Sequence, residues 1–248
     1  MPSLKIHFIG HASFKFQSQG ETIYFDPWLA PENPVAKLSL KDVRKATTVV
    51  CTHGHIDHLG QSIEICKKTG ACFISTPEVG MYCDLHGLPY DTEPHAYALN
   101  VGGSGRWGKV VYTCVNALHS TNIMGDEYRA EKRAFPDGQT VGYVLTFDNG
   151  LVLYDSGDTG VFGDMQLIAN LYRPQLCIMP AGGQYNMGIR EFAHACSLLR
   201  PEVVIPCHYD TFPRQRQDMK QLTAAVGVTS PSTRVVVMKP GDAFTFKR

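Results

Sequence analysis

Hydrophobic and polar positions alternate in short runs over the first part of the chain. The runs are separated by turn residues, as in a β-meander, and a period of two is typical of strands with one buried face. They are LKIHFIG (4–10), SFKFQS (13–18) and TIYFD (22–26). A continuous apolar run, TTVVC (47–51), predicts a fully buried strand. Apolar residues at helical spacing, which Gly70 ends, then predict one helix over 57–70.

The same succession of strand and helix patterns occurs again further on. The turn Asp148-Asn149-Gly150 joins two strands as a hairpin. Further strands are expected at 71–76, 95–100, 109–118, 176–181 and 203–208, helices at 165–172, 189–200 and 218–227, and a closing pair of strands within 234–246. Strand clusters followed by helices, twice over, predict an α/β (α+β) fold in which two sheets pack face to face with helices outside. No linker divides the chain, so we expect one domain over 1–248.

One segment, residues 120–139, carries neither pattern. It is polar, contains glycine and is longer than an ordinary connection, so it is either disordered or a functional loop. Because it follows His119 directly, we interpret it as a lid.

Composition excludes some classes of partner. Lys+Arg and Asp+Glu both number 23, so the net charge is zero and gives no general attraction to nucleic acid or anionic membranes. The basic stretches 129–133 and 214–216 are interpreted as solvated loop charges. No apolar run is long enough to cross a membrane. We therefore expect a small-molecule substrate and neither nucleic acid nor a membrane as partner.

The eight cysteines indicate a reducing compartment. None of them forms a C-x-x-C pair, and most stand in apolar segments, as buried thiols do. The first residues, MPSLKIHFIGH, do not have the pattern of an export signal. The expected location is the cytoplasm.

Coordinating side chains are concentrated in CTHGHIDHLG, residues 51–60. In extended backbone, residues two apart point the same way, which directs His53 and His55 toward one metal. Asp57 and His58 fall at the expected helix start, displaced toward a second position. Imidazole and carboxylate ligands suit zinc, manganese or iron(II).

Three further candidate ligands stand at the ends of expected strands. His119 follows the strand at 109–118, Asp158 lies in the glycine turn DSGDTG, and His208 ends the strand at 203–208. A single histidine at a strand end is more often structural than a ligand. Three such positions that complement the 51–60 cluster favour a metal centre with two ions.

These residues, THGHIDH with a later histidine, a GDT aspartate and a CHY histidine, resemble the metallo-β-lactamase superfamily over nearly the whole chain. The resemblance implies a four-layer αββα sandwich. It also implies a ligand set in which one metal is held by His53, His55 and His119, the other by Asp57, His58 and His208, and both are bridged by Asp158.

Within the superfamily, the chain is similar to small metal-dependent hydrolases near the L-ascorbate-6-phosphate lactonases. The supporting stretches are GHASF (10–14), FDPW (25–28), GDTGVFGDM (157–165), GGQYNMG (182–188) and HYDTFPRQRQD (208–218). Gln184 departs from this branch, which often has histidine there, so no acid role is assigned to it. The resemblance is compatible with a homo-oligomer.

The expected chemistry is hydrolysis. Two divalent ions about 3.5–4 Å apart can activate water and polarise a scissile group. Zn²⁺ or Mn²⁺ is expected, and Fe²⁺ is also compatible. Asp57 is the catalytic candidate, orienting the water and taking its proton, while Asp26 and His11 are expected beneath the site as hydrogen-bonding partners of the ligands. The bond attacked is of ester type, a phosphodiester or a lactone of a small molecule.

Two alternatives come from other classes. An oxygen or nitric oxide reductase with a di-iron site would have glutamate in place of His55, and such proteins usually carry a flavin domain for which this chain has no room. A non-catalytic metal-binding module would have lost ligands, whereas all seven expected ligands are present.

Overall fold

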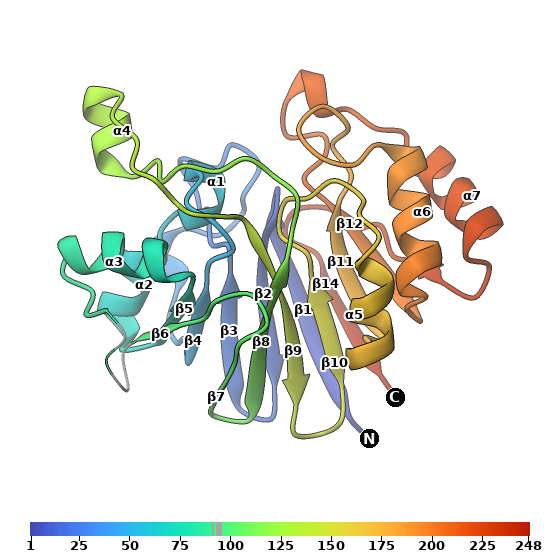
Figure 1. Ribbon diagram of the computed structural model, residues 1–248, viewed down its shortest axis with the longest axis horizontal. Coiled ribbons are helices and arrows are strands. Elements are labelled where there is room, and N and C mark those ends of the chain that lie inside the picture. Colours follow the sequence, from blue (N-terminus) through green and yellow to red (C-terminus); the bar gives the residue numbers. More distant parts are fainter. Residues whose placement is uncertain (91, 93–95) are drawn as a thin grey trace.

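The strands form two sheets that pack face to face in the computed structural model, which describes residues 1–90, 92 and 96–248 (Figure 1). The first sheet has the order β14-β1-β2-β3-β4-β5-β6 and the second the order β13-β12-β11-β10-β9-β8-β7. The first sheet consists of β1 (Ser3–Gly10), β2 (Ser13–Ser18), β3 (Glu21–Phe25), β4 (Thr48–Val50), β5 (Cys72–Ser75), β6 (Ala96–Ala98) and β14 (Ala243–Lys247). The second consists of β7 (Ser104–Trp107), β8 (Val110–Asn116), β9 (Val141–Phe147), β10 (Val152–Asp155), β11 (Leu176–Pro180), β12 (Val203–Cys207) and β13 (Arg234–Val235).

Helices cover the outer face of each sheet (Figure 1). Those near the first sheet are α1 (Ile56–Leu59), α2 (Ser62–Thr69) and α3 (Pro77–Leu85), with a 3₁₀ turn at Leu40–Asp42, while α4 (Asp126–Glu131) lies at the tip of the molecule. Those of the second half are α5 (Met165–Tyr172), α6 (Ile189–Leu199) and α7 (Met219–Thr229), with a 3₁₀ turn at Pro213–Gln215. Helices α2 and α3 contact β4, β5 and β6, while α5, α6 and α7 share a buried cluster with the second sheet. The expected four-layer αββα class is confirmed.

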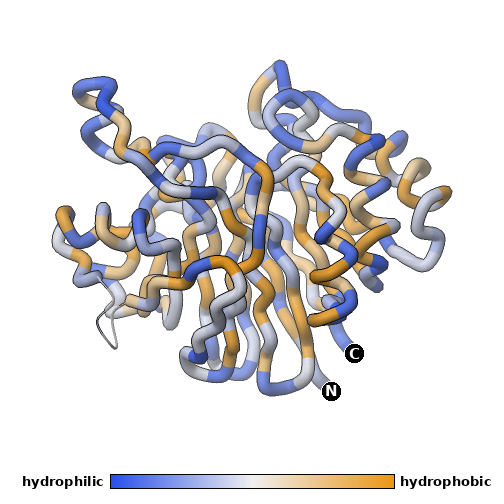
Figure 2. The backbone as a smooth tube through the Cα atoms, in the orientation of Figure 1, coloured by the Kyte–Doolittle hydropathy of each residue, from blue (hydrophilic) through white to orange (hydrophobic). Residues whose placement is uncertain are grey.

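The main core lies between the two sheets. Its largest members include Phe14, Phe16 and Phe25 from the first sheet and Tyr143 and Phe147 from the second, all buried. Burial of each such ring contributes roughly 1.5–3 kcal/mol. Figure 2 shows hydrophobic residues along the central strands and a mainly hydrophilic tip around α4.

One expected helix was wrong in detail. The single helix expected over 57–70 is divided into α1 and α2 at Gly60, where φ is +47° and a Cβ would lie 2.3 Å from the carbonyl oxygen of Pro27. Both closing strands are present, one in each sheet: β13 joins β12 in the second sheet and β14 pairs with β1 in the first. Strand β7 was not anticipated, and in the strand expected at 95–100, His95 lies outside the described residues.

The topology brings the carboxyl ends of several strands to one edge of the sandwich. In the first sheet β3 and β4 are parallel. In the second, β10 and β12 run parallel to β11, and β8 has the same direction because both it and β10 are antiparallel to β9. The segments that follow these strands carry the candidate ligands.

Candidate metal centre

The carboxylate of Asp158 lies at the centre of the candidate residues. Its Oδ2 atom is 3.1 Å from His208 Nε2, 3.5 Å from His58 Nε2 and 3.6 Å from His119 Nε2. These imidazoles follow β12, β4 and β8, so side chains from both sheets converge on one carboxylate oxygen.

Two groups of ligand atoms lie near this carboxylate, and His53 connects them, because its ligand atom is also within 4.8 Å of those of His58 and Asp158. The imidazoles of His53, His55 and His119 have ring nitrogens within 4.8 Å of one another, and His53 Nε2 is 3.0 Å from His55 Nδ1. That separation is close to the roughly 3.3 Å between two nitrogens on one tetrahedral zinc. In the other group, Asp57 Oδ2 lies 3.4 Å from His208 Nε2 and 3.9 Å from His58 Nε2.

Several of these atoms are buried without a hydrogen bond. Within the described part of the chain, His58 Nε2, His208 Nε2 and Asp158 Oδ1 have no hydrogen-bond partner. An unpaired buried polar atom costs free energy, and a convergent set of such atoms is what a metal ion satisfies. The residues therefore fit divalent metal ions with nitrogen and carboxylate ligands.

Asp26 holds two of the imidazoles from beneath. Its Oδ2 accepts from His58 Nδ1 at 2.7 Å and from the Thr52 hydroxyl at 2.7 Å, and its Oδ1 accepts from the Thr52 amide at 2.8 Å. Because the Thr52 hydroxyl donates to Asp26, its oxygen accepts from His53 Nδ1 at 3.0 Å. Both His53 and His58 thus carry the ring proton on Nδ1 and direct Nε2 into the site.

His11 performs the corresponding task for Asp57. Its Nε2 lies 2.9 Å from Asp57 Oδ2 and its Nδ1 lies 2.8 Å from the Thr211 hydroxyl. Both ring nitrogens are therefore engaged. Burial, together with His208, lowers the pKa of His11 to about 4, so the imidazole is neutral at physiological pH.

The pKa values of the other imidazoles differ from one another in the metal-free protein. Burial, with His58 next, lowers the pKa of His55 to about 4 and holds that of His53 well below its usual range. Burial also acts to lower the pKa of His208, but Asp158 and Asp57 outweigh it and raise the pKa to about 9. The first group therefore offers neutral imidazoles to a metal. Burial also acts to lower the pKa of His58, but Asp158 and Asp26 outweigh it and raise that pKa well above its usual range, so His58 and His208 must each give up a proton to bind a metal.

The backbone is strained where the site is built. His11, Asp26 and His208 have φ values of +61°, +43° and +58°, a region that non-glycine residues adopt at a cost. The amide of His208 also donates to the His11 carbonyl at 2.8 Å, which ties the two loops together. The three strained residues therefore lie together around the candidate ligands.

A cavity of about 590 Å³ opens over the candidate ligands. Its floor contains His55, Asp57, His119, Asp158 and His208. Its walls are Ser120, Tyr185, Phe212, Pro213, Arg214 and Gln215. The size suits a small molecule, and Arg214 is the one Lys or Arg among these described lining residues.

The segment 120–139 is not a lid in this structure. Of its residues only Ser120 lines the cavity, and the chain instead turns away through α4 and closes with a bridge between Ile123 and Phe135. Figure 1 shows α4 at the tip of the molecule, beyond α3. Gln184 is exposed and does not line the cavity, whereas its neighbour Tyr185 does.

Four residues that support the candidate ligands were not predicted from the sequence. They are Thr52, Thr211, Gln215 and Asp137, each buried or partly buried near a candidate ligand. Gln215 lies with its amide nitrogen 3.1 Å from His208 Nδ1, and its Oε1 has no partner within the described residues. With the amide turned, Oε1 would accept from Nδ1–H and leave Nε2 free for a metal. Polar loop residues of this kind carry no periodic signal, so only the fold reveals them.

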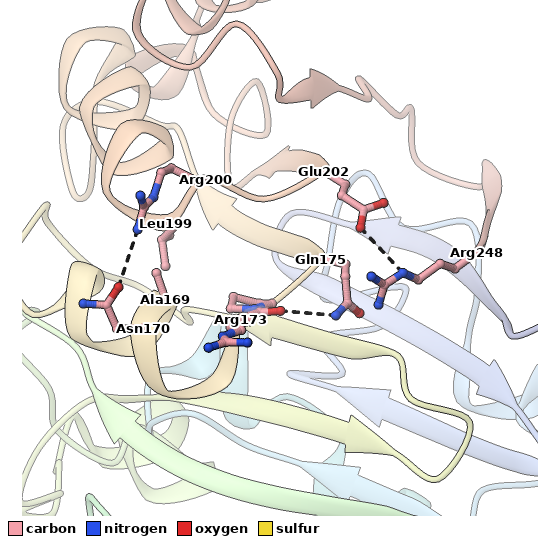
Figure 3. Close-up of a pocket in the computed structure, with 9 residues that line it drawn as sticks. Ala169, Asn170, Arg173, Gln175, Leu199, Arg200, Glu202 and Arg248 are labelled. Atoms are coloured by element: carbon pink, nitrogen blue, oxygen red, sulfur yellow. Dashed lines mark hydrogen bonds and ion pairs between the residues drawn. The ribbon is translucent and has the colours of Figure 1, made fainter.

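A larger hollow, of about 790 Å³, lies away from the candidate ligands and contains no such cluster. Figure 3 shows its charged groups: Arg248 faces Glu202 and Arg200 faces Asn170. Arg173 and Arg200 are the C-caps of α5 and α6, where positive charge complements the helix dipole. The positions of Arg173 and Arg200 at the ends of two helices therefore account for their presence in this hollow.

No helix in the described part of the chain is long and apolar enough to cross a membrane.

Comparisons with known proteins identify the family. A family model described as "Beta-lactamase superfamily domain" matches residues 5–208. A protein of Methanosarcina mazei named UPF0173 metal-dependent hydrolase is 38% identical over 243 residues, which are 98% of this chain and 99% of that protein. A protein of Koribacter versatilis with the same family name is 36% identical over 247 residues, 99% of each chain.

Among solved structures, Igni18 is similar over the whole chain. It is described as a novel metallo hydrolase from the hyperthermophilic archaeon Ignicoccus hospitalis, and it shares 34% sequence identity with a TM-score of 0.83 over 99% of both chains. The expected superfamily is confirmed: this chain belongs to the beta-lactamase superfamily and, within it, to the UPF0173 metal-dependent hydrolase family.

Proposed function

We propose that this protein is a hydrolase whose dinuclear metal centre activates water to attack an ester-type bond of a small molecule. The observation that carries the proposal is the position of Asp158 Oδ2, within 3.6 Å of imidazoles that belong to two separate groups of ligand atoms. A carboxylate in that position can bridge two ions. The names of the relatives, metal-dependent hydrolases, support the reaction class.

The ligand assignment follows the two groups. His53, His55 and His119 would hold one ion, Asp57, His58 and His208 the other, and Asp158 both. His11 also lies within reach of Asp57 and His208. Its two ring nitrogens already contact Asp57 and Thr211, so we keep it as a hydrogen-bonding partner.

Zinc or manganese is proposed, with iron(II) compatible, because the ligands are imidazoles and carboxylates. Divalent ions in such a site lower the pKa of water toward ~7 and draw electron density from the scissile group.

Asp57 is proposed as the residue that orients the attacking water and takes its proton. Burial acts to raise its pKa, but the hydrogen bond with His11 and the nearby imidazole of His208 outweigh burial and hold the pKa well below its usual range. The carboxylate is therefore ionised and can accept a hydrogen bond from water. Its side chain is 22% exposed and lines the cavity, so a water molecule can reach it.

The cavity walls favour a small anionic ester. Arg214 supplies a positive charge, and Tyr185 and Phe212 supply aromatic surface that is half exposed. A phosphodiester and a phosphorylated or carboxylated lactone both fit this description, and the lactone follows the resemblance to the sugar-lactone branch. The eight cysteines are buried and form no disulfide within the described residues, which supports a cytoplasmic location.

The test is hydrolysis by metal-stripped protein reloaded with zinc or manganese. A chromogenic phosphodiester and a panel of lactones are offered side by side, with Asp57→Asn as the control. Turnover of either class that depends on metal and is lost in Asp57→Asn supports the proposal and selects the substrate class. Turnover that survives in Asp57→Asn would remove Asp57 from its role, and the absence of turnover on both classes would overturn the ester assignment.

A further inference from the structure

The segment 120–139 is fastened to the peptide that lies between two proposed ligands. The amide of Gly54 donates to Asp137 Oδ2, and the carbonyl of Gly54 accepts from the Met124 amide at 2.7 Å. Both polar groups of the residue between His53 and His55 are therefore bound by the same distant segment. Neither bond involves a metal ligand directly.

Gly54 is also enclosed sterically. A Cβ at this position would lie 2.6 Å from Ile123 Cα and 3.0 Å from Asp137 Oδ2. Ile123 is buried, and its amide and carbonyl pair with those of Phe135 at 2.7 and 3.0 Å. The segment thus closes on itself at this pair and presses against the His53-Gly54-His55 turn.

The surroundings of Asp137 are unfavourable for a carboxylate. Its side chain is 1% exposed, and its Oδ1 has no hydrogen-bond partner within the described residues. The Thr121 hydroxyl and the Gly54 amide both donate to the same oxygen, Oδ2. A buried carboxylate with one unsatisfied oxygen costs free energy, so its presence calls for a role other than stabilising the loop.

We propose that Asp137 is a positioning residue of the metal centre. It fixes the Gly54 peptide, and with it the directions in which His53 and His55 leave the backbone, so that both imidazoles reach the same ion. Residues 121–137 lie against the His53-Gly54-His55 turn, here called the ligand turn, and hold it in place. This inference rests on the proposed function only in that His53 and His55 bind metal.

Variants at Asp137 test the role. Asp137→Ala removes both acceptors, whereas Asp137→Asn keeps an oxygen that can accept from Gly54 and Thr121 without the charge. Glu131→Gln, at the exposed end of α4 in the same segment, is the matched control. Zinc affinity is measured by competition with a chromophoric chelator, and the visible spectrum of the cobalt-substituted protein reports the ligand geometry.

Loss of an outer partner of a metal ligand typically weakens metal affinity 10–100-fold. We expect such a loss for one zinc equivalent in Asp137→Ala with an altered cobalt spectrum, a smaller loss in Asp137→Asn, and none in Glu131→Gln. Equal affinities and identical cobalt spectra in wild type, Asp137→Asn and Asp137→Ala would overturn the proposal.

The two proposals fail in different ways. If the wild type binds only one equivalent of metal, the proposed dinuclear function is wrong. The affinities of the Asp137 variants for that one equivalent still test the role of Asp137. If Asp137→Ala does not fold, Asp137→Asn and Thr121→Val take its place. Wild-type affinity and spectrum in both would then overturn the role of Asp137.

Discussion

Asp26 Oδ2 accepts a hydrogen bond from His58 Nδ1 at 2.7 Å, with both side chains fully buried. The bond fixes the tautomer of His58 and leaves Nε2 directed at Asp158, 3.5 Å away. A pair of this kind raises the basicity of the imidazole and keeps the ring oriented for a metal. The site is thus organised from its base upward, since Asp26 also engages Thr52, which accepts from His53.

Replacing Asp26 by Asn should weaken metal binding. The amide cannot accept from His58 Nδ1, Thr52 Oγ1 and the Thr52 amide together, so the support of His58 or of Thr52, which in turn contacts His53, is weakened. We expect a 10–100-fold lower zinc affinity in a chelator competition. Asp164→Asn, at an exposed position that makes no capping hydrogen bond to α5, is the control and should bind zinc as wild type does. An unchanged affinity in Asp26→Asn would show that the Asp26–His58 bond does not support metal binding.

Metal removal should lower the thermal stability. Without metal, His58 Nε2, His208 Nε2 and Asp158 Oδ1 remain buried and unsatisfied. A ligand at 100 times its Kd stabilises the folded state by about 2.7 kcal/mol, which corresponds to a Tm increase of roughly 5–10 °C for a chain of this length. Calorimetry of stripped and zinc-reloaded protein measures the shift. A Tm that does not respond to zinc would contradict a metal site built from these residues.

Asp137 should make stability depend on pH in the metal-free protein. Burial raises its pKa from 3.8 to about 6, although hydrogen bonds from Thr121 and Gly54 oppose this. A raised folded pKa means that protonation favours folding: the contribution is fully present below pH 3.8 and is lost as the pH rises through 6.

Asp137→Asn should therefore gain stability relative to wild type between pH 4 and pH 8, by up to about 3 kcal/mol on linkage grounds. Denaturant unfolding of both proteins across this range measures the difference. A variant that is more stable than the wild type but binds zinc more weakly would show that Asp137 positions the metal ligands and does not stabilise the fold. A stability difference independent of pH would mean that Asp137 does not titrate as its burial requires.

Arg214 should determine the affinity for anionic substrates. Arg214 lines the cavity, so loss of its positive charge removes an attraction that is present before and during the reaction. For Arg214→Gln we expect KM to rise about tenfold for an anionic ester with kcat nearly unchanged, and little effect on a neutral ester. Arg216→Gln, exposed in the same loop but outside the cavity lining, is the control. Equal effects on both esters would exclude this role.

The sequence indicated the layers, and it indicated side chains that the fold brings together, because both depend on local signals. Alternating strands give the sheets, and histidines at strand ends meet wherever the carboxyl ends of those strands share an edge. Asp26 and His11 were also expected beneath the site, and they lie in contact with His58 and Asp57.

The features that were not predicted from the sequence depend on contacts between distant segments. The helix expected over 57–70 ends early because Gly60 packs against Pro27, and no periodic pattern encodes that contact. Asp137 meets Gly54 across 83 positions of sequence. The segment around it was interpreted as a lid because its length and polarity suggested mobility, whereas its hydrogen bonds to Gly54 hold it against the ligand turn.

The central claim is that two ions share Asp158. Anomalous diffraction at the zinc edge from crystals of the zinc-loaded protein tests it most directly. We predict two peaks about 3.5–4 Å apart, one among His53, His55 and His119 and the other among Asp57, His58 and His208, with the Asp158 carboxylate between them. A single peak at saturating zinc, or a second peak that Asp158 does not contact, would contradict the account.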